Sequence, residues 1–190
     1  MAAGPYVAAS RRLRLRPLTR DDLELVAGWL AAGDEYLGAD ERLDAETLAA
    51  ALAWSEADPS VRLWALEDAD GEVVGMASWR PDLPWSWVLE LEFMLAPELR
   101  GRGYGFEASA LVIDHLFATT DAAKMLVRIS ALNRPAFPVI RRLGGEEEGR
   151  LRRHLRIGGA EVDLVVYGLL REDWERAARA RQRLLSVPDH

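Results

Sequence analysis

One short segment has the residue types and spacing to bind a phosphate: Arg100, Gly101, Arg102, Gly103, Tyr104 and Gly105. It lies between a predicted strand and a predicted helix. Glycines let the backbone approach a ligand closely and turn its N–H groups inward. The helix that follows adds the partial positive charge of its N-terminus, so the segment favours a phosphate or pyrophosphate. The alternative is a tight connection that binds nothing.

The two familiar nucleotide-binding motifs do not fit this segment. A P-loop ends in Gly-Lys followed by Ser or Thr, and the sequence contains no such triplet. A dinucleotide-binding fingerprint lies near the first strand of its domain, whereas these glycines follow roughly half of the chain. We therefore expect neither motif here.

A pair of carboxylates precedes the glycines on the same predicted strand. Glu90 and Glu92 are two residues apart, so their side chains are expected on one face of the strand. A carboxylate beside a bound ligand can act as a general base and take a proton from it. The alternative is that one or both carboxylates pair with an arginine of a neighbouring strand.

The elements that must position these residues follow from local patterns. Residues 12–16 alternate as a strand does, and Thr19 with Asp22 has the spacing of a capping box before a helix. Asp68 to Gly71 is a turn sequence between two strands. Further strands are predicted at 87–95, 124–130, 150–157 and 161–169, and further helices from Asp44, at 105–117, before Gly144 and at 172–185.

These elements predict an α/β (α+β) fold, with a mixed, mostly antiparallel central sheet of about seven strands flanked by helices. Neither repeats nor a low-complexity linker interrupt the chain. We therefore expect a single domain over residues 1–190, with a core at about 12–174 and a helical extension at 172–190.

Composition excludes several classes of function. The chain has no cysteine and three histidines, so we expect no cysteine thioester intermediate and no metal site. Its net charge of −7 argues against DNA as a partner. No apolar run approaches the ~20 residues that cross a bilayer. We expect a cytoplasmic protein with no membrane partner.

The glycine segment resembles the pyrophosphate motif of the GNAT superfamily of acyl-CoA-dependent N-acyltransferases. Arg100-x-x-Gly103-x-Gly105 matches the R/Q-x-x-G-x-G/A pattern after a strand that ends in an apolar pair and proline. The C-terminal region is similar to the ribosomal-protein-acetyltransferase branch through Asp163, Tyr167, Leu170 and Trp174. The resemblance implies an N-acetyltransferase that moves an acetyl group, or another short acyl group, from acyl-CoA directly to a primary amine of a small molecule or a protein N-terminus, with acetyl-CoA as the expected co-substrate.

The resemblance also implies roles for single residues. Backbone groups of Met94 and Leu95 are expected to pair with the pantetheine arm, and the N–H groups from Arg100 to Gly105 to hold the pyrophosphate. Asn133 is expected to contact the pantetheine, with a helix N-cap as the alternative. Glu90 is the expected base and Glu92 its reserve.

The sequence departs from the family at the usual proton donors. A tyrosine and a serine that many members carry in the helix after Asn133 are replaced by Ile140 and Ala136. Pro138 is expected to disturb this helix, because proline removes a backbone hydrogen bond. The general acid is therefore unassigned.

The acceptor site is expected in the loops. Trp79, Trp85 and Trp87 surround two prolines and are predicted either to wall a ligand pocket or to pack their own loop. Tyr36 and the acids Asp34 and Glu35 of the same loop are predicted to form an opposite wall that attracts a cationic amine. The alternative for this loop is a solvated surface.

Two other functions remain open on the sequence alone. The basic segment 150–156 is the one feature that favours an aminoacyl-tRNA as acyl carrier, although alternation predicts a solvent-exposed strand there. The missing donors at Ile140 and Ala136 favour a non-catalytic CoA-binding module. The intact glycine segment favours CoA over tRNA. A homodimer also remains open.

Overall fold

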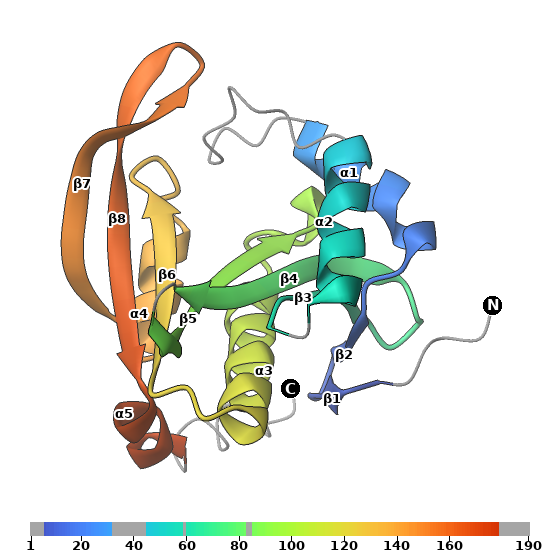
Figure 1. Cartoon of the computed structure of the whole chain (residues 1–190), viewed down its shortest axis with the longest axis horizontal. Coiled ribbons are helices and arrows are strands. Elements are labelled where there is room, and N and C mark those ends of the chain that lie inside the picture. The colour runs from blue at the N-terminus through green and yellow to red at the C-terminus, as the bar shows by residue number, and fades with distance from the viewer. Residues whose placement is uncertain (1–5, 32–44, 59, 83–84, 179–190) are drawn as a thin grey trace.

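The computed structural model describes residues 6–31, 45–58, 60–82 and 85–178 (Figure 1). Within them one sheet holds eight strands in the order β1-β2-β3-β4-β5-β6-β8-β7. All neighbours are antiparallel except β5 and β6. The strands are β1 (Ala8–Ala9), β2 (Arg14–Pro17), β3 (Arg62–Glu67), β4 (Val73–Asp82), β5 (Trp85–Leu95), β6 (Lys124–Ser130), β7 (Glu146–Ile157) and β8 (Ala160–Leu170).

Helices cover both faces of this sheet. α1 (Leu23–Ala31) and α2 (Ala45–Ala57) pack on one face, which we call the front face, against a core that includes Leu63 and Ala65 of β3. α3 (Tyr104–Thr119) and α4 (Ala136–Arg142) pack on the opposite, rear face. The short helices are η1 (Arg20–Asp22), η2 (Pro97–Leu99) and α5 (Arg171–Arg176).

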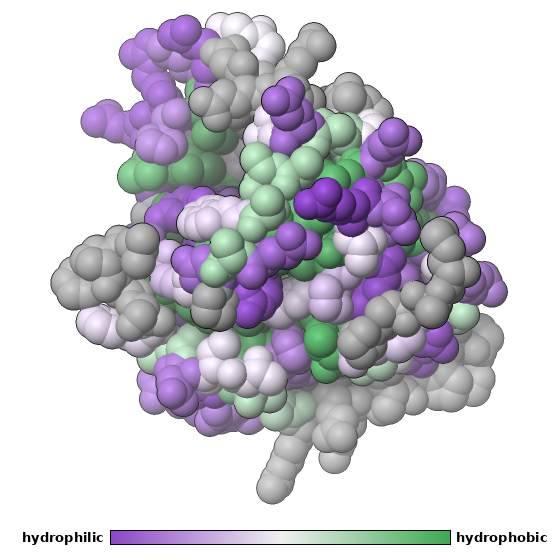
Figure 2. Space-filling view, turned by 45° about the vertical axis from the view of Figure 1, so that its right-hand side comes forward, coloured by the Kyte–Doolittle hydropathy of each residue, from purple (hydrophilic) through white to green (hydrophobic). Residues whose placement is uncertain are grey.

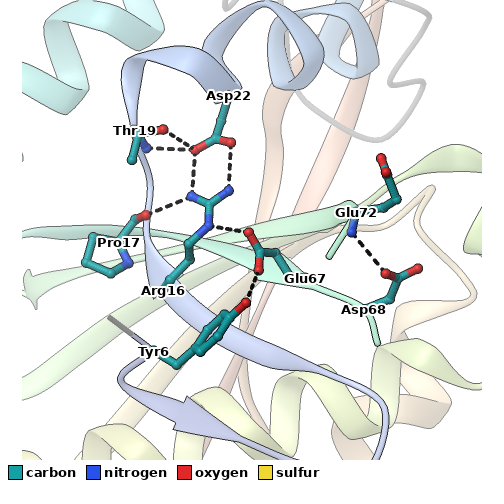
Figure 3. Close-up of polar contacts among 8 residues, drawn as sticks. All are labelled: Tyr6, Arg16, Pro17, Thr19, Asp22, Glu67, Asp68 and Glu72. Atoms are coloured by element: carbon teal, nitrogen blue, oxygen red, sulfur yellow. Dashed lines mark hydrogen bonds and ion pairs between the residues drawn. The ribbon is translucent and has the colours of Figure 1, made fainter. Parts of the chain in front are cut away.

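A buried ionic network fixes the start of the fold (Figure 3). The predicted capping box is confirmed: Asp22 accepts hydrogen bonds from the backbone N–H and the hydroxyl of Thr19, each at 2.8 Å. The Arg16 guanidinium donates to both oxygens of Asp22, at 2.8 and 2.9 Å, and also pairs with Glu67. Burial alone would raise the pKa of Asp22, but the hydrogen bonds from Arg16 and Thr19 hold it below its ordinary value.

The turn between β3 and β4 also matches its prediction. Asp68 accepts hydrogen bonds from the backbone N–H groups of Asp70 and Glu72, each at 3.0 Å, and Figure 3 shows the second of them. Gly71 has a φ of 83°, a conformation that glycine adopts without strain.

The single parallel pair opens along its length. β5 and β6 pair only through Val88 with Lys124, Leu89 with Met125 and Glu90 with Leu126. Beyond Glu90, β5 continues to Leu95 beside β4, while β6 continues to Ser130 beside β8. The two strands therefore part after Glu90, and the backbone edges that face each other there are not joined by ladder hydrogen bonds.

The hairpin of β7 and β8 forms the far edge of the sheet (Figure 1). Every residue of β7 is at least partly exposed, and the projecting end of the hairpin carries mostly hydrophilic side chains (Figure 2). A register shift between Leu151 and Leu155 interrupts the pairing, and Arg153 lies in the left-handed region at φ 54°. Such a bulged, charged edge resists pairing with another strand.

The predicted fold class is confirmed, with small differences in extent. The eighth strand is β1, two residues long, which alternation over so short a segment does not reveal. β7 begins at Glu146, four residues before its predicted start, because Glu146 and Glu147 pair with β8. No described helix is both long and apolar enough to span a membrane.

Candidate functional site

Two glycines shape the loop before α3. Gly101 and Gly103 have φ angles of 73° and 79°, which a residue with a Cβ adopts only under strain. Gly103 is the N-cap of α3, and no side chain caps that helix. The first N–H groups of a helix have no partner within it. The backbone N–H groups of Arg100 and Arg102, two of the predicted donors, instead donate to the carbonyls of Pro97 and Leu99 at 3.3 and 3.4 Å. The donors left for a ligand are those at the start of α3, at the positive end of a 16-residue helix dipole.

Backbone direction decides which residues of β5 face the opening between β5 and β6. The Ala96 N–H donates to Val74 at 2.9 Å, toward β4, whereas the Trp87 carbonyl accepts from Ala123, on the β6 side. Alternation then directs the N–H and C=O groups of Leu95 toward the opening and those of Met94 toward β4. Among the described residues, the Leu95 carbonyl accepts one long hydrogen bond, 3.4 Å, from Nε of Arg100.

Alternation identifies a second residue of β5 whose backbone faces the opening. Phe93 lies two residues before Leu95 in an unbroken register with β4, so its backbone groups point the same way. The pair that can add a strand from the open side is therefore Phe93 and Leu95. Of the two residues named from the family pattern, Leu95 lies on this edge and Met94 does not.

Asn133 follows the end of β6, on the other side of the opening. Its backbone carbonyl accepts from the N–H of Ala136 at 3.1 Å, but the N-cap of α4 is Pro135. The alternative role of Asn133 as a side-chain N-cap is therefore not what the structure shows. Within the described residues, the side-chain amide of Asn133 makes no hydrogen bond, so it can serve a ligand.

The two predicted carboxylates share the front face, as expected, but their surroundings differ. Glu90 is buried, with 6% of its side chain exposed, and lies between two arginines. Arg80 of β4 donates to it through Nε at 3.0 Å and Nη2 at 2.6 Å, and Arg128 of β6 pairs with its other oxygen. Burial alone would raise the pKa of Glu90, but the hydrogen bonds from Arg128 and Arg80 hold it below its ordinary value.

Glu92 is open to solvent by contrast. Its side chain is 63% exposed, accepts a hydrogen bond from Ser78 at 3.2 Å and lies 3.7 Å from Nη2 of Arg80. Pairing with an arginine, the alternative for these carboxylates, is thus what the structure shows closely for Glu90 and, in the longer contact with Arg80, also for Glu92. Glu92 keeps an exposed carboxylate that can contact an acceptor.

Arg80 and Arg128 are the site residues that the sequence analysis missed. Arg128 also pairs with Asp82 at 3.2 Å. Negative and positive side chains therefore alternate across the front face, and we call these five residues the charged row: Glu92, Arg80, Glu90, Arg128 and Asp82. The sequence does place Arg80 on a strand, the one that follows the predicted turn at Asp68–Gly71. The register that places it opposite Glu90 is not readable from that pattern.

The structure does not bring Trp79 or Trp87 together with the carboxylates. Trp79 packs in the core beside α3 on the rear face, where its ring centroid lies 6.4 Å from that of Trp64. Trp87 is an odd-numbered residue of β5, so its side chain points away from the face that carries Glu90 and Glu92. Packing, the alternative for these residues, is what the structure shows for Trp79.

Trp79 instead borders two adjoining hollows on the rear face, of about 360 and 260 Å³. Both also reach Thr120, directly after the C-terminal end of α3. The glycine loop lies at the other end of this helix, about 24 Å away at 1.5 Å per residue. The hollows are therefore separate from the candidate site.

Two predicted acceptor contacts cannot be placed. Tyr36 and its acidic loop fall outside the described residues, and nothing is described of the side chain of Trp85. Both remain predictions.

The two residues that replace the usual proton donors lie in the helix after Asn133 and pack where it contacts the core. Ile140 is buried against Ile129, Val165 and Tyr167, and Ala136 packs at the edge of the same cluster. Neither side chain carries a proton to donate. Pro138 is tolerated because it is the third residue of α4, where a backbone N–H has no acceptor within the helix.

The N-terminal segment buttresses the glycine loop, a contact that local patterns do not reveal. Glu107 of α3 is buried and accepts from the Ser10 hydroxyl at 2.7 Å and from the backbone and Nε of Arg12 at 2.8 and 2.6 Å. The Arg12 guanidinium lies 4.2 Å above the ring of Tyr104. This contact fixes the first turn of α3 from the outside.

Comparison with known proteins identifies the family. A sequence model of the acetyltransferase (GNAT) domain matches residues 12–146. The chain belongs to the GNAT acetyltransferase family. It is 29% identical over 106 residues to the putative ribosomal N-acetyltransferase YdaF of Bacillus subtilis, which covers 56% of this chain and 58% of that protein. The chain thus spans little more than half the length of this curated relative.

Solved structures show the same fold. A structure described as a putative acetyltransferase is 30% identical, with a TM-score of 0.74, over 97% of this chain and 96% of the other. The spermidine N-acetyltransferase of Vibrio cholerae, in complex with CoA and spermine, is 21% identical with a TM-score of 0.78, over 86% of this chain and 98% of the other. At that identity the second likeness concerns the fold alone.

Proposed function

We propose that this protein transfers an acetyl group from acetyl-CoA directly to a primary amine of a small molecule or a protein N-terminus. One observation carries the proposal: β5 and β6 part after Glu90, and the parted edge leads to a glycine loop with unpaired N–H donors at the start of α3. A pantetheine arm can pair with such an edge as an added strand, and a pyrophosphate suits such a loop. Family membership supports the same reading.

Particular residues suit each part of the donor. The backbone groups of Phe93 and Leu95 would hold the pantetheine arm, and Asn133 would contact it from the side of β6. The N–H groups at the start of α3, from Gly103 to Gly105, would hold the pyrophosphate. Acetyl-CoA supplies the thioester whose carbonyl carbon the amine attacks.

Glu92 is the side chain best placed to handle the acceptor. An ammonium group cannot attack a thioester, so the amine must lose a proton first. Glu92 is exposed and on the same face as the charged row, so it would bind the ammonium and take its proton through a water. Glu90, which the family pattern favours as the base, has both oxygens engaged by arginines. Its role is then to hold Arg80 and Arg128 in place.

The leaving group completes the balance of the reaction. The nitrogen–carbon bond forms, the carbon–sulfur bond breaks, and the thiolate of CoA leaves. Ile140 and Ala136 offer no proton, so the thiolate would be protonated by solvent. This is chemically tolerable because alkyl thiols are far more acidic than water (the thiol of cysteine has a reference pKa of about 8.5), so a thiolate can leave without a proton.

Finer assignments belong to the same proposal. We place the protein in the cytoplasm, where the proposed donor is a metabolite. A homodimer and the ribosomal-protein branch stay predictions, the second supported by the name of the curated relative.

Donor binding can be tested without any acceptor. CoA should raise the melting temperature by mass action, with about 2.7 kcal/mol of added stability at roughly 100 times Kd. Gly105→Glu should abolish this shift, because the carboxylate would meet the pyrophosphate, while the backbone there needs no left-handed conformation. Gly28→Glu, at an exposed position of α1 with open space around it, is the matched control. An undiminished shift in Gly105→Glu would show that the loop does not bind CoA.

A further inference from the structure

The residues of the charged row on the front face differ in how far their side chains are exposed to solvent. Glu90, at its centre, is buried and compensated on both sides. The exposed groups beside it are the carboxylate of Glu92 and the guanidinium of Arg80, with 63% and 49% of their side chains exposed. An acceptor that approaches Glu92 therefore meets a cation directly beside the anion.

Arg80 has a free edge to offer. Its Nε and Nη2 atoms are held by Glu90, which fixes the plane of the guanidinium. Its Nη1 atom makes no hydrogen bond or ion pair with any described residue. A guanidinium held on one edge and exposed on the other is suited to bind an oxygen anion with little loss of conformational entropy.

The same arrangement disfavours a polyamine. Once one ammonium group binds at Glu92, a second positive charge on the same short chain meets Arg80, which lies 3.7 Å from that carboxylate. Arg128 is the next cation along the row. Like charges at such distances repel each other, and dissolved salt screens this repulsion only in part because the charges lie closer together than the Debye length.

We propose that the acceptor is zwitterionic, with an anionic group close to its reacting amine, and that Arg80 binds this anionic group while Glu92 binds the ammonium. The inference rests on the proposed acetyl transfer and names the substrate class for that same site. It separates this chain from a polyamine acetyltransferase on the basis of its own charges.

Three amines of equal carbon chain length test the inference: butylamine, putrescine and γ-aminobutyrate. They differ only in carrying a neutral, cationic or anionic far end. Acetyl-CoA is the donor, and release of free thiol is measured. The value of kcat/KM for γ-aminobutyrate should exceed that for butylamine by at least about tenfold, because the free energy of a hydrogen bond between charged groups corresponds to a factor of about that size. Putrescine should be the poorest of the three.

Variants assign the preference to Arg80. Arg80→Gln should bring γ-aminobutyrate and butylamine to nearly equal kcat/KM, mainly through a higher KM for γ-aminobutyrate, while Arg80→Lys should keep most of the preference. Arg156→Gln, which removes an exposed arginine of β7, should change nothing. The melting-temperature shift with CoA reports in each variant that the donor site is intact.

The outcomes distinguish a failure of the zwitterion inference from a failure of the proposed acetyl transfer. Equal transfer to all three amines, or a preference for putrescine, would overturn the zwitterion inference and leave acetyl transfer standing. A preference that survives Arg80→Gln would overturn the role of Arg80. Bound CoA with no transfer to any amine would overturn the proposed function and the inference with it.

Discussion

At the scale of single residues, Glu90 and Glu92 have opposite environments although they lie two positions apart. Both point to the front face, but one is held by two arginines and the other is exposed. A carboxylate whose oxygens are occupied and whose pKa is lowered is a poor proton acceptor. The geometry therefore separates a carboxylate that organises the site from one that can act on an acceptor.

This separation predicts different effects of the same substitution. Glu92→Gln should lower kcat/KM by about 10²–10⁴, the usual contribution of a general base, and leave CoA affinity and stability nearly unchanged. Steady-state kinetics with one fixed amine, together with CoA titration, would measure both. Near-full activity of Glu92→Gln at neutral pH would mean that the amine enters already neutral.

Glu90→Gln should act mainly on stability. It leaves two arginines around a group that no longer carries charge, and we expect a loss of roughly 1–3 kcal/mol, less than for a fully buried pair because Arg80 is half exposed. Urea unfolding would measure the loss. If Glu90→Gln is as stable as the parent protein but as inactive as Glu92→Gln should be, Glu90 is the base after all.

At the scale of elements, local signals were enough for some features and not for others. The capping box of Thr19 and Asp22, the turn at Gly71 and the glycine loop are each defined within six residues, so the sequence reveals them. Partners such as Arg128 and Glu90 lie on strands far apart in the chain, and only the register of β5 and β6 brings them together.

The tryptophans are a different case, because the signal was present in the sequence. The alternation that places Glu90 and Glu92 on one face places Trp87, an odd-numbered residue of the same strand, on the other. Whether the parted backbone edge belongs to Met94 or to Phe93 needed the hydrogen bonds of Ala96 and Trp87 to decide.

The C-terminal end of α3 depends on an arginine from α5. The Arg171 guanidinium donates to the carbonyls of Phe117, Ala122 and Thr120, the last two at 2.7 Å each, and its centre lies 4.8 Å above the Phe117 ring. A cation at this end of a helix also complements the helix dipole. Arg171 therefore joins the last described helix to the helix that carries the glycine loop, together with Trp174, whose Nε1 donates to Asp114 of α3 at 2.7 Å.

Arg171→Met should accordingly destabilise the protein by about 2–3 kcal/mol, because it leaves partly buried carbonyls unpaired while keeping an apolar contact with Phe117. Arg176→Met is the control and should cost little, because Arg176 lies on the same helix but is exposed and, among the described residues, pairs only with Asp173. Both are measured by denaturant unfolding. Equal losses in the two variants would contradict the special role of Arg171.

At the scale of the whole molecule, the buried titratable groups predict how stability depends on pH. The pKa values of Asp22, Glu90 and Glu107 are lowered: burial opposes this, and hydrogen bonds from Arg16, from Arg128 and Arg80, and from Ser10 and Arg12 outweigh it. Groups with lowered folded pKa values add stability above their ordinary values of 3.8 for Asp and 4.5 for Glu. That stability is lost as pH falls through the folded pKa values.

His115 adds a second, milder window. Burial lowers its pKa below the ordinary value of 6.5, so the folded state resists the protonation that the unfolded state accepts. The melting temperature should therefore be level above about pH 7, decline slightly below pH 6.5 and fall steeply below pH 4.5. His115→Phe should remove only the first decline. A melting temperature that rises on acidification from pH 7 to 5 would contradict this account.

The central claim is that the parted strands and the glycine loop serve acetyl transfer, and one measurement tests it most directly. Purified protein is mixed with acetyl-CoA and a panel of primary amines, and release of free thiol is followed together with the mass of the acetylated amine. We predict amine-dependent thiol release with one acetylated amine formed per thiol, abolished in Gly105→Glu and retained in Gly28→Glu. Thiol release that is independent of amine, or equal in the two glycine variants, would contradict the claim.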